Sequence, residues 1–333
     1  MLAAAGATYF MDVALNTDRM LAYFDTSAHD NQTLREIHGR EPAGAYLQWC
    51  VERGILARDD AGAVVRGPSW GRPERFCESA AEFAELVAAT PALHGFEAAG
   101  PRPADAVARR VRWHQAVGRA AVHLPLDGAR LRALAPFREI ATAAATHDSH
   151  LAAPALGARP ADGALEPFAA EPFPVQILVS DGLSAAAVHT NLPDLLPVLC
   201  DGLAGRGIGV GTPLLARHGR VKLAEPVGER LGAEVVIHLI GERPGGDAVA
   251  SRSLSAYLVY RLPEDVRAEA ARSSGHAGIG HEVTVISNIH AGGLPPVEAA
   301  AQIVEKTAQI LHHRAAGNRL EGLLAAASHR VRG

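Results

Sequence analysis

The sequence has few of the features that mark disulfide-rich, secreted or membrane proteins. Only three of its 333 residues are cysteine, and no two of them form a Cys-x-x-Cys pair. A disulfide framework and a structural zinc site are therefore unsupported, and a reducing cytoplasm fits best. No uncharged apolar run reaches the roughly 18 residues that a membrane-spanning helix needs. The first residues lack a basic segment and reach Asp12 early, so they do not resemble a signal peptide.

The chain also lacks a strong excess of either charge. Its formal net charge is −4, and 20% of its residues are charged. This balance gives no reason to expect nucleic acid or a membrane as a partner. Hydrophobic residues make up 48% of the chain, which is usual for a globular protein, and the length allows two domains with separate cores. A small molecule or another protein is the expected partner.

Residues 1–122 are expected to form a mainly helical region. A strand is predicted near its start, at 7–15, and a turn or small hairpin at 62–73, where Gly and Pro are frequent. The predicted helices span 31–38, 42–54, 79–89 and 105–122. The last of these is basic, and its arginines spread over more than one face, which is typical of a solvent-exposed helix.

Residues 123–174 are expected to connect this region to a second domain. They begin as a helical connection, and the stretch 152–174 holds five prolines among alanines without a sustained period. Such a composition predicts an extended or irregular linker rather than part of a core.

Residues 175–333 alternate between strand and helix patterns. Predicted strands span 175–179, 208–216, 234–240, 254–262 and 282–286. Predicted helices span 185–189, 191–204, 224–231, 264–271 and 296–315. This order is typical of an α/β fold with a doubly wound, mostly parallel sheet. Because no helix is predicted between the strands at 234–240 and 254–262, the second of these is expected to pair antiparallel with the first.

Three of these strands run into polar loops, at 180–184, 241–245 and 287–293. Ligands of open α/β sheets bind beyond the carboxyl ends of the strands, so the loops predict one shared site. Glu242 is a candidate hydrogen-bond acceptor, and the alternative is an ion pair with Arg243 or Arg252. Asp181 is a second candidate, and the alternative is that it caps a helix. Ser287 begins a segment rich in small residues that suits close approach of a bulky ligand.

Two further motifs do not predict a dinucleotide-binding or metal site. The glycine-rich segment 205–211 follows a predicted helix and precedes a strand, whereas a dinucleotide-binding loop joins a strand to a helix. These glycines are expected to end the helix. Residues 148–153 approach the Asp-x-His-x-x-Gly pattern of proteins that ligate cobalt through histidine, but the glycine is missing. No metal site is expected.

Six blocks of the second half together resemble the small subunit of ethanolamine ammonia-lyase. They are VSDGLS (179–184), GRVK (219–222), LGAEVV (231–236), GERPG (241–245), SLSAY (253–257) and VISNIHAGGLPPVEAAA (285–301). Three blocks near the start resemble the carboxyl-terminal end of the large subunit: YFMDV (9–13), TDRMLAYFDTSAHD (17–30) and PAGAYLQW (42–49). The chain therefore resembles a large-subunit remnant joined to a small subunit.

The resemblance implies a Rossmann-like domain that binds adenosylcobalamin against a catalytic β/α barrel in a separate large subunit. It implies cobalamin contacts at Val221, Glu242 and Val285, where some relatives have Cys in place of Val285. Met20 falls where the large subunit has a methionine near the cobalamin. Asp181 and Ser287 are candidates from their loops alone.

The implied reaction is the radical rearrangement of ethanolamine to acetaldehyde and ammonia. The residues that bind ethanolamine belong to the barrel, so no catalytic residue is expected in this chain and no turnover by the chain alone. An alternative is a non-catalytic cobalamin-binding or assembly module that has lost its barrel. A third, a nicotinamide-dependent oxidoreductase, is disfavoured by the position of the glycines. The resemblance implies a location in the cytoplasm or within a bacterial microcompartment.

Overall fold

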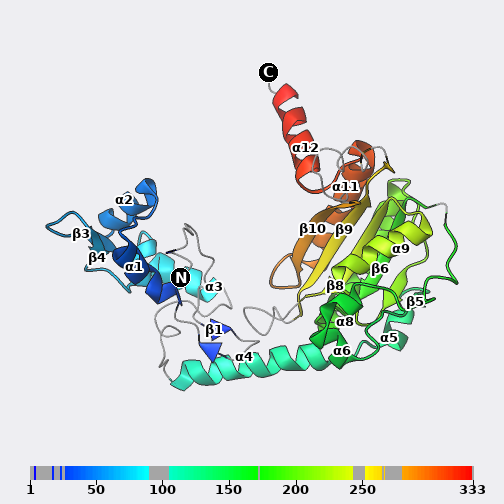
Figure 1. The fold of residues 1–333 in the computed structure, drawn as a ribbon, viewed down its shortest axis with the longest axis horizontal. Coiled ribbons are helices and arrows are strands. Elements are labelled where there is room, and N and C mark those ends of the chain that lie inside the picture. The colour runs from blue at the N-terminus through cyan, green and yellow to red at the C-terminus, as the bar shows by residue number, and fades with distance from the viewer. Residues whose placement is uncertain are drawn as a thin grey trace. The chain divides into compact units, whose positions relative to one another are not determined.

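The computed structural model describes residues 4, 17–18, 23–24, 27–89, 105–171, 173–242, 252–264, 266 and 280–331 (Figure 1). The chain divides into two compact units, one containing residues 1–118 and the other residues 119–244 and 248–333. The expected strand at 7–15 and Met20 lie outside the described residues. Among the described helices, none is long and apolar enough to cross a membrane.

The first unit consists of short helices around a small hairpin. Its elements are β1 (Thr17–Asp18), β2 (Tyr23–Phe24), α1 (Ser27–His38), α2 (Gly44–Glu52), β3 (Leu56–Arg58), β4 (Val64–Arg66), η1 (Pro73–Phe76), α3 (Ala80–Ala89) and most of α4 (Asp105–His123). The four expected helices are all present. The hairpin formed by β3 and β4 starts earlier than the expected position at 62–73.

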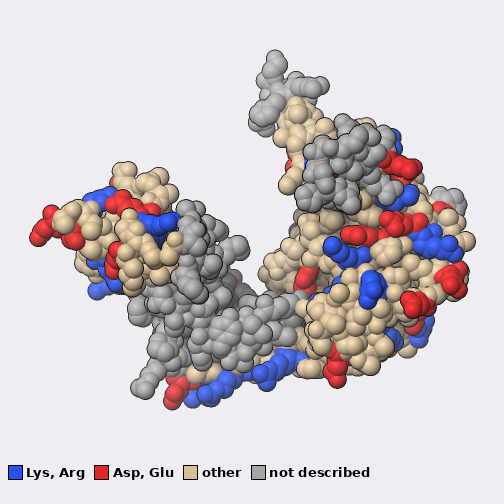
Figure 2. All heavy atoms as spheres, in the orientation of Figure 1, with Lys and Arg blue, Asp and Glu red and all other residues tan. Residues whose placement is uncertain are grey.

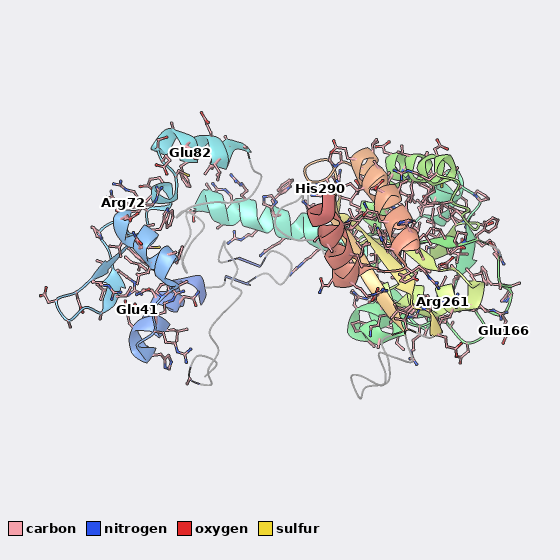
Figure 3. The ribbon with its side chains drawn as sticks, turned by 90° about the horizontal axis from the view of Figure 1, so that it is seen from above. Glu41, Arg72, Glu82, Glu166, Arg261 and His290 are labelled. Atoms are coloured by element: carbon pink, nitrogen blue, oxygen red, sulfur yellow. The ribbon has the colours of Figure 1, made fainter. Side chains whose placement is uncertain are left out.

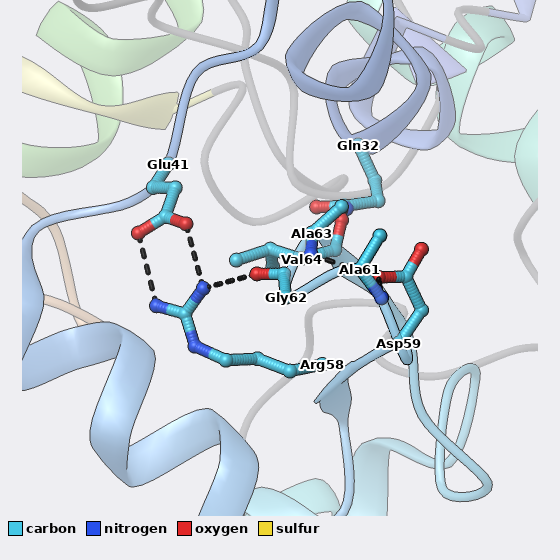
Figure 4. Close-up of polar contacts among 8 residues, drawn as sticks. All are labelled: Gln32, Glu41, Arg58, Asp59, Ala61, Gly62, Ala63 and Val64. Atoms are coloured by element: carbon cyan, nitrogen blue, oxygen red, sulfur yellow. Dashed lines mark hydrogen bonds and ion pairs between the residues drawn. The ribbon is translucent and has the colours of Figure 1, made fainter.

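Local hydrogen bonds explain where this hairpin turns (Figure 4). The carboxylate of Asp59 accepts hydrogen bonds from the backbone N–H groups of Ala61 and Ala63, at 3.0 and 2.8 Å. The guanidinium of Arg58 donates to both carboxylate oxygens of Glu41 and to the carbonyl of Gly62. A side chain that bonds to the backbone two to four residues ahead favours a turn. The polar residues around the turn therefore determine its position.

A six-stranded sheet forms the centre of the second unit. Its strands are β5 (Arg138–Ile140), β6 (Val175–Ser180), β7 (Leu214–Ala216), β8 (Val235–Gly241), β9 (Leu254–Arg261) and β10 (His281–Ile289), in the spatial order β10-β9-β8-β6-β7-β5. Strands β5, β7, β6 and β8 are parallel. Strand β9 is antiparallel to β8 and to β10. The mostly parallel α/β sheet and the antiparallel strand at 254–262 are therefore confirmed.

Helices cover both faces of this sheet. Helices α8 (Ala185–Gly205) and α11 (Pro296–His313) share one core with alternate residues of the strands, and α9 (Ala224–Leu231) shares a second core on the opposite face. All six residues of β6 and all seven of β8 are buried. Continuous apolar strands are expected where both faces of a sheet are covered. The remaining elements are α5 (Gly128–Arg132), α6 (His147–Ala152), α7 (Pro154–Gly157), η3 (Val221–Leu223) and α12 (Gly317–Val331).

The region 123–174 contributes more to this unit than expected. Strand β5 was not predicted, yet it pairs with β7 and forms one edge of the sheet. The Ala/Pro-rich stretch is largely irregular, as predicted, but Phe168 is only 4% exposed and packs in the α9-side core. The guanidinium of Arg138 lies 4.1 Å from the centre of its ring. Proline prevents regular hydrogen bonding there without preventing a neighbouring aromatic side chain from packing.

Helix α8 is continuous, although two helices were expected at 185–189 and 191–204. Pro193 has no N–H to donate to the carbonyl of His189, which instead accepts a hydrogen bond of 3.1 Å from the Arg130 side chain. Asn191 does not cap a second helix, because its amide donates to the carbonyls of Ala187 and Arg252. Hydrogen bonds from other segments therefore compensate for the proline.

The remaining predictions for the second unit agree with the structure at one point and differ from it at others. Helix α8 ends at the glycines as predicted: Gly207 has a positive φ of 69°, and the N–H of Ile208 donates to the carbonyl of Leu203. The strand expected at 208–216 is limited to β7. Helix α12, which follows α11, was not predicted. The expected helix at 264–271 lies almost wholly outside the described residues.

Candidate functional site

The carboxyl ends of the parallel strands lie at one edge of the sheet. Strand β10 reaches the same edge, because Gly241 of β8 is paired with Leu254 of β9, and Leu254 is paired with Ile289 of β10. The loops after β6, β7, β8 and β10 therefore open at a common edge, where the polar loops of the sequence were expected to meet.

Two of these loops are in direct contact. Gly182 has a φ of +52°, and a Cβ atom on it would lie 2.2 Å from the carbonyl oxygen of Gly241. A Cβ atom on Gly241 would in turn lie 2.1 Å from the carbonyl oxygen of Ser184. The N–H of Leu183 donates to the carbonyl of Gly241 at 2.9 Å. Only glycine allows this approach, which brings the segment after β6 against the start of the Glu242 loop.

Glu242 is bound by a tyrosine of the neighbouring strand. The hydroxyl of Tyr257 in β9 donates a hydrogen bond of 2.9 Å to Oε1 of Glu242. Burial of the phenol and the nearby Glu242 carboxylate raise the pKa of Tyr257 to about 12. The phenol therefore stays protonated, and so remains a donor, at neutral pH. The sequence suggested Arg243 or Arg252 as the partner of Glu242, and it did not identify Tyr257. Arg243 lies outside the described residues.

The strand register places Val285 on the same face of the sheet. Tyr257 is the direct partner of His238 in β8 and of Val285 in β10. Directly opposed residues of antiparallel strands point to the same face, and adjacent strands lie about 4.8 Å apart. Val285 is 46% exposed and therefore presents an apolar surface next to Tyr257.

Val221 is tied to the same row of residues by its backbone. Its carbonyl oxygen lies 3.3 Å from Nδ1 of His238, whose Nε2 lies 2.7 Å from Oγ of Ser180. His238 is fully buried, and this burial lowers its pKa to about 4. The ring is therefore neutral at neutral pH and accepts at one nitrogen while it donates at the other. His238 and Tyr257 thus link Val221, Glu242 and Val285, the contacts that the resemblance implies, on the α9 side of the sheet.

Asp181 occupies a buried position behind this patch. Its Oδ1 accepts a hydrogen bond of 2.6 Å from the N–H of His218, which has a left-handed φ of 58°. Burial raises the pKa of Asp181, and the charge and backbone N–H of His218 and the N–H of Gly219 oppose that rise. Helix α8 is capped by Ser184 instead. The carboxylate therefore holds the loop after β7, next to Val221, and does not cap the helix.

Comparison with known protein families identifies this sheet and its loops. Residues 80–321 match the family model of the ethanolamine ammonia-lyase light chain (EutC). The protein belongs to the ethanolamine ammonia-lyase light chain family. Residues 1–64 match the model of the ethanolamine ammonia lyase large subunit (EutB), so both parts of the resemblance are confirmed. The light-chain match includes α3 and α4, and therefore starts earlier than the expected limit of the large-subunit-like region at residue 122.

The end of β10 and the turn that follows it lie at the same edge of the sheet. Ser287 is exposed, and Asn288 has a positive φ of 60°. The N–H of Gly292 donates to Nδ1 of His290, and Nε2 of His290 lies 2.8 Å from Oδ1 of Asn288; His290 is labelled in Figure 3. A Cβ atom on Gly293 would lie 2.4 Å from the carbonyl oxygen of Asn288. Gly293 therefore serves the turn itself, whereas Ser287 and Asn288, at the end of β10, are exposed.

The histidines of the light chain near this edge are held by backbone carbonyls. His150, from the motif at 148–153, is 1% exposed, and its Nε2 lies 2.7 Å from the carbonyl oxygen of Gly182. Nitrogens of His147 and His218 lie 2.8 and 3.0 Å from the carbonyls of Val122 and Ala144. Within the described part of the chain, no group of three His, Cys, Asp or Glu residues could hold a metal ion.

An open cavity lies beside η3. Its volume is about 780 Å³, and its lining mixes small residues with charges of both signs: Ala143, Ala155, Ala158, Arg159, Pro160, Asp162, Lys222, Glu225 and Pro226. Lysine, arginine and acidic residues are likewise interspersed over the visible face of the second unit (Figure 2). The cavity adjoins Val221 through Lys222 but contains none of the predicted contact residues.

Proposed function

We propose that this chain is the small subunit of adenosylcobalamin-dependent ethanolamine ammonia-lyase and holds the cobalamin against a catalytic barrel subunit. One observation carries the proposal: Glu242 is held by Tyr257, which is paired with Val285 on one side and, on the other, with His238, the histidine next to the Val221 carbonyl. When bound, adenosylcobalamin supplies the cobalt–carbon bond whose homolytic cleavage starts the rearrangement of ethanolamine to acetaldehyde and ammonia.

The chemistry of these residues fits a corrin. The periphery of a corrin carries primary amides, and a carboxylate is a strong acceptor for amide N–H groups. Tyr257 contacts Oε1 of Glu242, so Oε2 is the oxygen through which an amide of the ligand would bind. The exposed Val285 and partly exposed Val221 offer apolar surface on either side. Ser287 adds a hydroxyl at the rim, and Asp181 acts indirectly by holding the loop that leads to Val221.

The family assignment supports a separate large subunit as the partner. In this proposal the barrel of that subunit binds ethanolamine, and this chain contributes binding surface without a catalytic residue. The match of residues 1–64 to the large-subunit family supports contact between Met20 and the cobalamin in the assembled enzyme. The chain alone is expected to release no ammonia from ethanolamine, and appreciable release from purified chain, cobalamin and ethanolamine would refute this.

The alternative is a cobalamin-binding or assembly module that no longer takes part in turnover. One observation favours this alternative: the match to the large-subunit family covers only the short segment 1–64. Addition of a separately purified large subunit separates the two possibilities. Restored ammonia release supports the working subunit, and failure to associate supports the non-catalytic module.

Binding of cobalamin by the assembled subunits tests the role of Glu242. Titration with adenosylcobalamin, followed by its visible absorption, is expected to show at least about tenfold weaker binding for Glu242→Gln, because a charged acceptor contributes about 1.5–3 kcal/mol. Glu298→Gln is the matched control, since Glu298 is exposed on α11. Equal affinity of Glu242→Gln and the unaltered chain would remove Glu242 from the site.

A further inference from the structure

We infer that Tyr257 is a positioning residue that sets the orientation of the Glu242 carboxylate before the cofactor binds. The inference rests on the proposed cobalamin-holding function. Tyr257 lies in the middle of β9. The experiment below can contradict its positioning role while the proposed function still stands.

The backbone of Tyr257 is fixed from both sides. Its strand lies between β8 and β10, and Tyr257 is paired directly with His238 on one side and Val285 on the other. Its ring packs against the α9-side core. A side chain anchored in this way has few accessible rotamers, so the position of its hydroxyl is well defined.

Within the described residues, the one hydrogen bond to the Glu242 side chain is that from Tyr257. Glu242 follows the last residue of β8, and its side chain has three rotatable bonds that would otherwise be free to reorient. The 2.9 Å hydrogen bond from Tyr257 restricts these bonds and uses Oε1. The carboxylate therefore meets an incoming amide with Oε2 in a fixed place, which lowers the entropy lost on binding.

A competing partner makes this restraint more important. Arg220 is partly buried, which lowers its pKa, and attraction from Asp181 and Glu242 opposes that shift. The Arg220 cation therefore attracts the Glu242 carboxylate. Without the Tyr257 hydroxyl, the carboxylate would be free to turn toward Arg220 and away from the ligand.

A double-mutant cycle tests the inference in the complex with the large subunit. Tyr257→Phe keeps the ring and removes the hydroxyl, and it is expected to weaken adenosylcobalamin binding about five- to tenfold. In the Glu242→Gln background the same change is expected to have little effect, because the group that Tyr257 orients has lost its charge. Tyr46→Phe is the control, since Tyr46 is an exposed tyrosine of the first unit.

A spectroscopic readout separates positioning from a merely structural role. With tyrosine labelled at Cζ, the NMR signal of Tyr257 is identified by its loss in Tyr257→Phe. At about pH 10.5, near the ordinary pKa of tyrosine, Tyr257 is expected to remain protonated in the unaltered chain and to ionise partly in Glu242→Gln. Circular dichroism at the same pH checks that both chains are folded. Identical ionisation in the two chains would contradict the coupling.

The outcomes distinguish the inference from the proposed function. If Glu242→Gln weakens binding and Tyr257→Phe does not, the positioning role is overturned and the function stands. If neither weakens binding, the function itself fails. Equal losses from Tyr257→Phe in both backgrounds would mean that Tyr257 contacts the ligand directly, which also overturns the inference. If Tyr257→Phe folds poorly, Glu242→Asp is used in its place. The shorter side chain keeps the negative charge but no longer reaches the Tyr257 hydroxyl. Unchanged cobalamin affinity of Glu242→Asp would contradict the inference.

Discussion

Ser180 and His238 are joined by a buried hydrogen bond of 2.7 Å that links the parallel strands β6 and β8. Both residues are fully buried, and the second ring nitrogen of His238 lies 3.3 Å from the carbonyl of Val221. The ring therefore connects two strands of the sheet to the segment that begins η3. The position of one predicted cobalamin contact depends on a histidine that makes no contact with solvent.

Replacement of His238 by Ala is expected to destabilise the second unit by roughly 2–4 kcal/mol. The change leaves the Ser180 hydroxyl without its partner and opens a cavity in the α9-side core. Urea unfolding followed by circular dichroism measures the loss. His312→Ala, on the exposed part of α11, is the control and is expected to change stability by less than about 0.5 kcal/mol. Equal stability of the two variants would show that the hydrogen bonds of His238 contribute nothing.

Stability is expected to fall as the pH falls from about 6.5 to about 4. Burial lowers the pKa of both His150 and His238 to about 4, below the ordinary value of 6.5. Between these two values the unfolded chain binds protons that the folded chain does not, so acid favours unfolding. At about 1.4 kcal/mol per pKa unit, each histidine lowers the stability by at most roughly 3.5 kcal/mol once the pH has fallen below about 4. Urea midpoints across this range should fall less steeply in His238→Gln than in His312→Gln.

Gly241→Ala is expected to disrupt the contact between the loops after β6 and β8. Its Cβ atom would lie 2.1 Å from the carbonyl oxygen of Ser184 and 2.4 Å from that of Asp181, and both are backbone atoms. A loss of more than about 2 kcal/mol and weaker cobalamin binding are expected, since Glu242 is the next residue. Gly205→Ala is the matched control, because no atom lies within 4 Å of its added Cβ. Thermal unfolding that does not separate these two variants would contradict the close approach.

Asp181→Ala is expected to release the loop after β7 and to cost about 1–3 kcal/mol. The change leaves the partly buried N–H of His218 without its acceptor. Asp181→Asn keeps an oxygen acceptor and should cost less. Hydrogen exchange at the amide of His218, measured by NMR, is expected to speed up in Asp181→Ala and to remain slow in Asp201→Ala, a change on the exposed side of α8. Unchanged protection in Asp181→Ala would show that another group holds the loop.

Much of the second unit could be predicted because its strands are apolar on both faces. The runs that became β6, β8 and β9 are bounded by polar or glycine-rich segments, so their positions and the parallel arrangement follow from local pattern. Strand β5 has three residues, and only one of them, Ile140, is buried. Such a short stretch carries no detectable alternation, and its pairing with β7 became visible only in the folded sheet.

Partners from distant segments could not be predicted in the same way. The single helix α8 depends on Arg130, which supplies the hydrogen bond that Pro193 cannot make to the carbonyl of His189. Local propensity favours a break at proline, and only a donor 59 residues away removes the cost. The hairpin of the first unit, by contrast, is positioned by local partners, since Asp59 and Arg58 bond to the turn that follows them.

The amino-acid sequence by itself determined most strands of the sheet, its polar edge and, through six blocks, the family. Its polar loops predicted one shared site, and its resemblance to the family implied Glu242, Val221 and Val285 as contacts. Only the tertiary structure decided which residues link them, because the register between β8, β9 and β10 brings His238, Tyr257 and Val285 into a single row. A pattern along the chain reports which face of a strand is buried, but the residue opposite it is set by pairing with another segment.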